Sequence, residues 1–350
     1  MKAFVTGSTG LLGSNLVRLL LAQGHEVKAL ARSAAKAERV FKHTAVEIVI
    51  GDMQDVAAFA PTLAGCDVLF HCAAYFREYY GAGDHWPKLQ KINVDGVREI
   101  LEAAAAQGVQ KAIHVSSSGV IGMNGDQPGD ESTSPSPLVE HNLYFRSKVL
   151  AEEVVQKFIT EHEMPVTMIL PGWMMGPGDA APTDSGQLVL DLLHGDLPGV
   201  VAGGTSAVDV RDVAQAMMAA VENGHSGERY IVGGRLATME AIAQTVADLT
   251  GANVPRKIPY PIVLAMAWAS ETKARLTNSE TLLTVNGVRT LHASLTVSSA
   301  KAARELGASF RPLRETLTDE IRWFAANGYV DASVDLADTA VAAKLKIKQA

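Results

Sequence analysis

The sequence predicts an α/β fold, a doubly wound parallel sheet followed by a smaller, mostly helical C-terminal substrate lobe. Over the first 170 residues, short β-rich runs alternate with segments of helix-compatible sequence. That alternation is typical of parallel strands with helices on both faces of the sheet. After about residue 172 the chain is rich in Gly and Pro, and then in helical patterns with few strand signals. The first part should therefore hold the sheet and the second part the smaller lobe.

The predicted strands are the runs KAFVT, EVKALA, VEIVI, DVLFH, KAIHVS and VTMIL. Apolar residues at helical spacing predict a helix over 11–23 that ends at Gly24, and another over 88–107 that ends at Gly108. The segment 208–222, VDVRDVAQAMMAAVE, reads as a short strand and a helix capped by Asp212. The apolar stretch 262–269, IVLAMAWA, is too short to span a bilayer and is expected to be a buried or pocket-facing helix, with weak contact with a membrane or an apolar substrate as the alternative.

We expect the following domain organisation from these elements. The sheet domain covers residues 1–172, and 205–232 returns to it. The substrate lobe comprises 173–204 and 233–330, and 331–350 forms a loosely held tail.

Composition narrows the function. A net charge of −7 without a long basic run argues against a nucleic-acid surface and against attraction to anionic lipid. The remaining partner class is a small molecule. The two cysteines, Cys66 and Cys72, lack metal-ligand spacing and suit a reducing compartment, so no metal is expected. A strand that begins by the second or third residue leaves no room for a signal peptide, which favours the cytoplasm.

A glycine turn joins the first strand to the first helix. Gly7, Gly10 and Gly13 in TGSTGLLG lie where the backbone of a Rossmann-type fold approaches a pyrophosphate, whose charge the helix N-terminus can bind. The N–H groups around Thr9, Leu11 and Leu12 would then face the dinucleotide.

The end of the second strand distinguishes the two nicotinamide dinucleotides. Arg32 and Lys36 stand there and no acidic residue occurs before Glu38. A basic residue at this position favours the extra phosphate of NADP, so the sequence predicts NADP(H), with NAD(H) the alternative if Arg32 is merely solvated. After the third strand, Asp52 and Met53 are expected at the adenine, and Asp52 could also cap a helix.

Tyr144 and Lys148 in YFRSK lie one helical turn apart on the same face. A tyrosine hydroxyl with a pKa near 10 becomes a useful acid or base when a nearby cation stabilises its phenolate. A serine hydroxyl at a neighbouring strand end would complete such a site, and Ser116, Ser117 and Ser118 all follow the fifth strand.

These motifs together resemble the extended short-chain dehydrogenase/reductase superfamily. The resemblance covers nearly the whole chain, through GSTGLLG, GDMQD, HCAA, NVDGVREILEAA, VSSSGVIG, YFRSK, GPGD and VRDVAQA in the family's order. It implies Tyr144 as the general acid/base, Lys148 as its activator and Ser117 as the serine, with Ser118 in reserve. The nicotinamide is expected near Cys72, Ala73, Ala74 and Pro171, with Asn93 in the helix beneath the site.

Within the superfamily the chain looks most like the branch of dihydroflavonol reductases, aldehyde and ketone reductases and hydroxysteroid dehydrogenases. Nucleotide-sugar epimerases usually carry an Arg after the sixth strand, where this chain has ILPGWMMGPGD. An apolar substrate pocket is therefore expected, with plain packing between the lobes as the alternative for each member: Tyr75, Phe76, Ser118, Tyr79, Tyr80, Trp173, Met174 and Met175.

The leading hypothesis is an NADPH-dependent reductase acting on a hydrophobic aldehyde or ketone. A nucleotide-sugar epimerase or dehydratase with transient internal redox is the second hypothesis, and a non-catalytic NADP-binding protein the third. The resemblance also implies a possible homodimer through helices at 88–107 and 141–162. Arg211 is expected to be structural, within the VRD motif.

Overall fold

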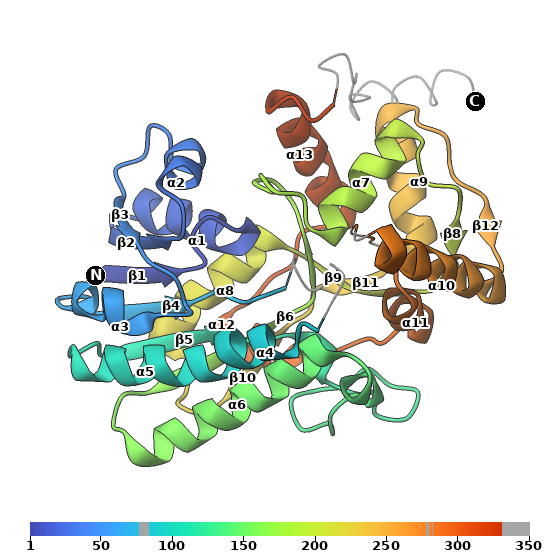
Figure 1. The fold of residues 1–350 in the computed structure, drawn as a ribbon. Coiled ribbons are helices and arrows are strands. Elements are labelled where there is room, and N and C mark those ends of the chain that lie inside the picture. The colour runs from blue at the N-terminus through green and yellow to red at the C-terminus, as the bar shows by residue number, and fades with distance from the viewer. Residues whose placement is uncertain (77–83, 278, 280, 282, 331–350) are drawn as a thin grey trace.

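The computed structural model describes residues 1–76, 84–277, 279, 281 and 283–330. Its centre is a parallel sheet of seven strands in the order β10-β6-β5-β4-β1-β2-β3, which confirms the predicted fold class (Figure 1). The strands are β1 (Lys2–Thr6), β2 (Glu26–Ala31), β3 (Glu47–Ile50), β4 (Val68–His71), β5 (Lys111–Val115), β6 (Val166–Pro171) and β10 (Arg229–Val232).

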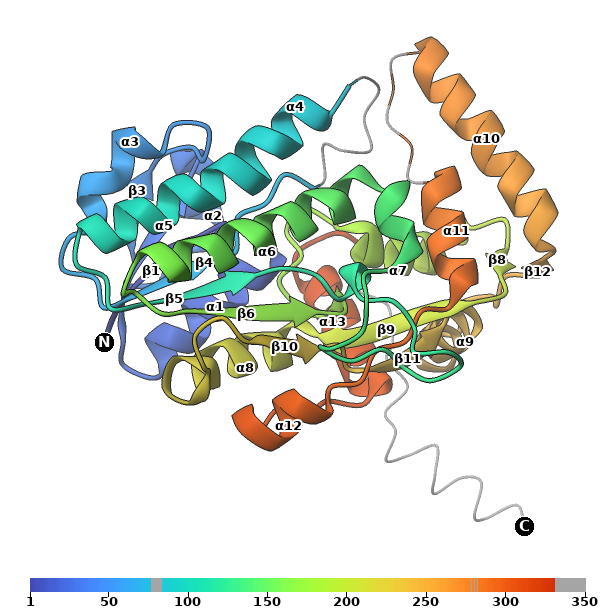
Figure 2. The same cartoon turned by 90° about the horizontal axis from the view of Figure 1, so that it is seen from below.

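Helices cover both faces of this sheet (Figure 2). One apolar core lies against α1 (Leu11–Ala22), α2 (Ala34–Val40), α8 (Val210–Asn223) and α12 (Ala300–Leu306). The other lies against α3 (Val56–Phe59), α5 (Gly96–Ala106) and α6 (Leu143–Glu161). Two buried faces explain why the strands read as continuous apolar runs and not as alternating ones.

The predicted helix ends agree with the structure. After α1 the backbone of Gly24 has φ +78°, and after α5 that of Gly108 has φ +79°, a left-handed conformation that glycine adopts without strain. The helix expected over 88–107 is built from α4 (Trp86–Leu89), a π-helical turn over Gln90–Asp95, and α5.

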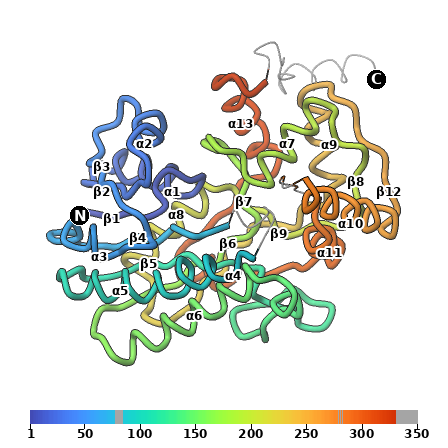
Figure 3. Tube along the Cα trace, viewed as in Figure 1, coloured from blue at the N-terminus to red at the C-terminus, as the bar shows by residue number. Residues whose placement is uncertain are grey.

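The C-terminal lobe packs beyond the carboxyl ends of the central strands (Figure 3). A third core joins α7 (Asp184–His194), α9 (Met239–Thr250) and α13 (Leu313–Ala326) to a small sheet of β7 (Trp173–Met175), β9 (Gly204–Asp209) and β11 (Arg235–Thr238). Beside it lie α10 (Tyr260–Thr277), α11 (Val285–Ala293), β8 (Val200–Val201) and β12 (Lys257–Ile258). Within 205–232, β9 belongs to the small sheet, whereas α8 packs on α1 and β10 extends the central sheet.

Two expectations about local structure were wrong. Asp209, not Asp212, caps α8, because the helix begins at Val210 and the Asp209 carboxylate accepts the Arg211 N–H at 2.8 Å. Asp212 lies in the first turn and binds the backbone N–H and guanidinium of Arg311. Arg211 has the structural role expected of it, since its guanidinium pairs with Asp209 and Asp319.

The second correction concerns 262–269, which is buried on one face only. This stretch opens α10 and buries Val263 and Ala267, but Ile262 is 53% exposed and Trp268 66% exposed. The predicted tail at 331–350 lies outside the described residues. Within the part of the chain that is described, no helix combines the length and apolar character needed to cross a membrane.

Candidate active site

The predicted site residues collect at the carboxyl ends of the central strands. The strand order reverses between β1 and β4, since β2 lies on one side of β1 and β4 on the other. Such a reversal opens a crevice where ligands bind in doubly wound folds. The two strand ends are joined by Thr6, whose hydroxyl accepts the Ala73 N–H at 3.1 Å and lies 2.7 Å from Nδ1 of His71.

The glycine turn is tightly packed against this reversal. Gly7 has φ +63°, and a Cβ on it would lie 2.7 Å from the backbone nitrogen of Ala73. A Cβ on Gly13 would lie 2.2 Å from the Gly7 carbonyl oxygen. Both positions therefore exclude any side chain. The Gly10 N–H donates to that same carbonyl at 3.0 Å, which closes the turn directly before α1.

The start of α1 fits a pyrophosphate. Gly10, its N-cap, is exposed and offers no capping side chain, and the first turn has no acidic residue. A Cβ on Gly10 would meet only the Gly7 oxygen within 4 Å, so the space beside it is open. The first turn of α1 begins with Leu11 and Leu12 and follows the loop that contains Thr9. Its backbone N–H groups have no partner within the helix, so they can bind an anion at this end.

Arg32 and Lys36 follow the end of β2. Between them Ser33 caps α2 by accepting the Lys36 N–H at 3.3 Å, which fixes the start of that helix beside the strand end. Asp52 follows β3 and accepts the Gln54 N–H at 2.9 Å, while Met53 is buried in the core. The cap of the following helix is Asp55, so the helix-cap alternative for Asp52 was wrong.

Tyr144 and Lys148 lie in the first turns of α6. Asn142 caps this helix by accepting the N–H groups of Tyr144 and Phe145 at 3.0 and 3.2 Å. The Lys148 ammonium donates to the Val115 carbonyl at the end of β5, at 3.0 Å. It lies 5.7 Å from the centre of the Tyr144 ring, so the cation stands beside the phenol.

Burial shifts both groups toward their neutral forms. It raises the pKa of Tyr144, which keeps the hydroxyl protonated at neutral pH. It lowers the pKa of Lys148 to about 8, against the opposing effect of the Glu152 carboxylate. At neutral pH the pair is therefore mainly a phenol beside an ammonium group.

Glu152 is a site-forming residue that the sequence analysis missed. It is 8% exposed, accepts the Ser116 hydroxyl, and pairs with Arg229 of β10 at 3.3 Å. Its place four residues after Lys148 on the same helix was the available signal. The Arg229 partner is 77 positions away, and no local pattern indicates it.

The three serines after β5 have separate surroundings. Ser116 is buried, and its hydroxyl donates a hydrogen bond to the Glu152 carboxylate. Ser117 is half-buried, and its Oγ accepts the Gly119 N–H at 3.2 Å. Ser118 begins a short 3₁₀ turn that runs to Val120. Since a hydroxyl that accepts one bond can still donate another, the Ser117 hydroxyl keeps a proton to donate, whereas that of Ser116 is directed at Glu152.

Cys72, Ala73 and Ala74 follow β4, and Pro171 ends β6 with Val232 of β10 opposite. Burial raises the pKa of Cys72 to about 12, so this thiol stays protonated. Sequence reasoning also placed Asn93 beneath the site. Its amide bonds both backbone groups of Tyr75, at 2.7 and 3.1 Å, and the Ser147 hydroxyl at 3.0 Å.

The residues predicted for a substrate pocket divide into different environments. The Phe76 ring lies 4.7 Å from that of Tyr144. Tyr75 is buried, with its hydroxyl 2.8 Å from Nδ1 of His85. Trp173 packs on the core of the C-terminal lobe and Met174 on the core around α1, while Met175 is fully buried. Tyr79 and Tyr80 lie outside the described residues.

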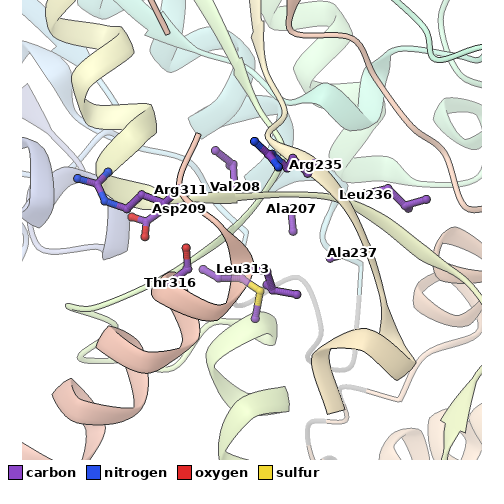
Figure 4. Close-up of a pocket in the computed structure, with 10 residues that line it drawn as sticks. Ala207, Val208, Asp209, Arg235, Leu236, Ala237, Arg311, Leu313 and Thr316 are labelled. Carbon is purple, nitrogen blue, oxygen red and sulfur yellow. The ribbon is translucent and has the colours of Figure 1, made fainter. Parts of the chain in front are cut away.

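A separate pocket of about 120 Å³ lies where β9 and β11 face α13 (Figure 4). Arg235 and Arg311 stand on different sides of it, above Leu313 and Thr316. The Arg311 guanidinium binds Asp212 and Glu315. Among the predicted residues only Met175 reaches this pocket, so it is distinct from the Tyr144 site.

Comparison with known proteins assigns the fold and the family. The model of the NAD dependent epimerase/dehydratase family matches residues 3–233. A Synechocystis protein provisionally named dihydroflavonol 4-reductase is 31% identical, over 93% of this chain and 95% of its own. Sterol demethylase protein B of Methylococcus capsulatus is also 31% identical, over 94% of this chain and 100% of its own.

Solved structures agree with this assignment. The structure of gox2253 superposes with a TM-score of 0.80 at 33% identity, covering 94% of this chain and 99% of that one. A UDP-glucuronic acid 4-epimerase from Bacillus cereus, solved with UDP-glucuronic acid and NAD, has a TM-score of 0.75 at 20% identity, over 93% of this chain and 100% of that one. That level of identity establishes a shared fold alone.

Proposed function

The chain belongs to the NAD dependent epimerase/dehydratase family, and we propose that within it the protein is an NADPH-dependent reductase of hydrophobic aldehydes or ketones. The observation that carries the proposal is the setting of Tyr144. Its phenol is half-buried against the Phe76 ring, it stands beside the Lys148 ammonium, and burial holds its pKa high. A protonated phenol thus has an aromatic ring and a cation as neighbours, which suits proton donation to an apolar carbonyl compound.

The roles of the residues follow from this setting. Reduced nicotinamide, when bound, supplies a hydride to the carbonyl carbon. Tyr144 donates its phenolic proton to the carbonyl oxygen, so that hydride and proton together yield the alcohol. Ser117 donates a hydrogen bond to the same oxygen as negative charge develops on it. Lys148 stabilises the phenolate that remains, which then takes a proton from solvent.

The preference for NADPH rests on the end of β2. Arg32 and Lys36 place positive charge where a ribose phosphate would lie, and no carboxylate stands at the strand end to bind ribose hydroxyls. Arg32→Asp should raise the KM for NADPH by at least about tenfold and leave that for NADH unchanged or lower. Arg39→Asp, on the last turn of α2, is the matched control.

The hydrophobic substrate rests on Phe76 and on the names of two relatives. The dihydroflavonol reductase and the sterol demethylase protein are named for multi-ring compounds. A diphosphate-bearing sugar would need cations in addition to Lys148, whereas the rings that contact Tyr144 are those of Phe76 and Phe145. The reading as an epimerase or dehydratase remains the second candidate because the family contains such enzymes.

The test is loss of reduced-nicotinamide absorbance with NADPH or NADH, over aromatic aldehydes, diketones, steroid ketones and nucleotide sugars. We expect an apolar carbonyl compound to oxidise NADPH. In Tyr144→Phe the rate of this oxidation should fall about 10²- to 10⁴-fold. Tyr260→Phe, on α10, makes the same chemical change outside the site and should keep full activity.

Two outcomes would contradict the reductase. Full turnover by Tyr144→Phe would show that Tyr144 is not the proton donor. Conversion of a nucleotide sugar without net change of NADP(H), together with cofactor that stays bound through purification, would favour the epimerase or dehydratase.

A further inference from the structure

The outer face of α10 is apolar and exposed. Ile262 is 53% exposed, Trp268 66% and Leu276 83%, the largest exposed fraction among the large hydrophobic side chains of the described chain. At about 100° per residue these three fall on one side of the helix. The same face carries the exposed small residues Pro261, Ala265 and Ala269.

The opposite face of α10 holds the helix on the protein. Its buried residues are Val263, Ala267 and Ala274. Val263 and Ala267 form a small core with Val201 of β8 and Val288 of α11. Both views place α10 at the outer edge of the C-terminal lobe (Figures 1 and 2). The apolar outer face is therefore turned away from the rest of the molecule.

Positive charge borders the apolar face on both sides. By the helical period, Lys273 follows one edge of the face and Arg275 the other, and both are exposed. Residues 254–293 contain five Lys or Arg and two Glu, and one of the five, Lys257, is paired with Glu240 of α9. The other four basic residues still outnumber the two glutamates, although the net charge of the whole chain is −7.

We propose that α10 docks on the surface of a phospholipid bilayer that contains anionic lipid. Apolar residues flanked by Lys and Arg are the pattern of a helix that lies in the membrane interface, with the basic side chains at the level of the headgroups. Trp268, in the middle of the exposed face, is of the residue type enriched at that depth. In a symmetric contact between two copies, the outer face of α10 would offer Lys273 and Arg275 no acidic side chain, whereas anionic headgroups would pair with them, which favours the bilayer over a second copy.

The proposal is independent of the reaction proposed above. It predicts a weak, reversible association, because the negative charge of the whole chain opposes the attraction of a few basic residues to anionic lipid. Binding should therefore need both the apolar face and the local charge.

The experiment is cosedimentation of the full chain with vesicles of phosphatidylcholine, with and without phosphatidylglycerol. We expect binding to the mixed vesicles, weakened about tenfold or more by Trp268→Ser. Arg275→Gln should weaken it about fivefold, and only on vesicles with phosphatidylglycerol. The matched pair Ile262→Ser and Leu236→Ser alters side chains that are 53% and 54% exposed, and only the first should weaken binding.

Depth is measured with lipids brominated in the acyl chains, which should quench the fluorescence of Trp268. Trp268→Phe should still bind and lose that quenching. Unchanged thermal unfolding of each variant shows that it is folded. No sedimentation of the wild type, or equal binding by Trp268→Ser, would overturn the proposal. So would a dimer in gel filtration that Trp268→Ser dissociates, since the face would then bind a second copy.

Discussion

Glu152 and Glu320 are both buried glutamates, and their neighbours make them different chemical groups. Glu152 lies among donors and cations, since Ser116, Arg229 and Lys148 all face it. Glu320 of α13 accepts the Gly176 N–H at 3.1 Å, and its other oxygen has no hydrogen-bond partner within the described residues. Its charged neighbours are the carboxylates of Asp179 and Asp209.

The difference shows that charge pairing, more than depth, decides how a buried carboxyl behaves. Burial raises the pKa of both. For Glu152 the Ser116 hydroxyl and the Arg229 guanidinium oppose that rise, whereas for Glu320 the charge of Asp179 adds to it. Glu152 can thus serve as an anion that balances Lys148, whereas Glu320, whose pKa is raised, joins α13 to the segment after β7 by accepting the Gly176 N–H.

The largest expected effect comes from removing the cation that Glu152 balances. Under the proposed reaction, Lys148→Met should lower kcat by about 10²- to 10⁴-fold, because the phenolate of Tyr144 loses its stabilising charge. It should also raise the pKa of Glu152. The measurement is kcat against pH. Lys157→Met, further along α6 in an exposed pair with Glu161, is the control and should retain full activity.

The ion pair with Arg229 should matter next. Arg229→Met leaves the Glu152 carboxylate with one cation fewer and should lower the free energy of unfolding by about 2 kcal/mol, less than for a fully buried pair because Arg229 is partly exposed. Urea unfolding measures this. Arg229→Lys should recover part of the loss. Equal stability of Arg229→Met and wild type would mean that Ser116 and Lys148 alone hold Glu152.

Glu320 predicts a dependence of stability on pH. Its pKa in the folded protein is raised well above the unfolded value, so the folded state binds a proton that the unfolded state releases. The stability that this bound proton gives to the folded state is present in full below the pKa of Glu320 in the unfolded chain, about 4.3. It is lost as the pH rises through the pKa of Glu320 in the folded protein. The charged groups around it are Asp179, Asp209 and Arg211, which is bound to Asp209.

Glu320→Gln removes this proton and keeps the acceptor for Gly176. It should match the wild type near pH 4 and become the more stable protein as pH rises, by up to about 1.4 kcal/mol per pH unit. Thermal unfolding across pH gives the comparison. Glu315→Gln, on an exposed part of α13, should show no such divergence. A constant difference between Glu320→Gln and wild type would mean that Glu320 is ionised when folded.

The sheet, the glycine turn and the Tyr144–Lys148 spacing could be predicted because each is local in the sequence. The spacing of apolar residues along the chain predicts the alternation of strands and helices. At the turn, the close approach of Gly7 to Ala73 leaves room for glycine alone. Helix caps were harder, because Asp209 and Asp212, or Asp52 and Asp55, are near-equivalent candidates in sequence. Only the backbone start of each helix separates them.

Other features depend on contacts between distant segments. Glu152 meets Arg229 from a strand at the far edge of the sheet, and Glu320 reaches Gly176 across the C-terminal lobe. The helix α10 is apolar on both faces, so its sequence could not show which face the protein covers. These contacts explain why the network around Lys148 was missed and why α10 was expected to be buried.

The smallest expected effect separates Ser116, which is bound to Glu152, from its neighbour Ser117. Ser116→Ala removes a hydroxyl donor from a buried carboxylate and should lower the free energy of unfolding by about 1 kcal/mol. Because Ser116 is committed to Glu152, we expect kcat to change by less than about threefold, whereas Ser117→Ala should lower it about 10²-fold under the proposed reaction. Comparable losses of kcat in the two variants would place Ser116 and Glu152 in the proton pathway, and the paired carboxylate would then act in the chemistry and not only in placing Lys148.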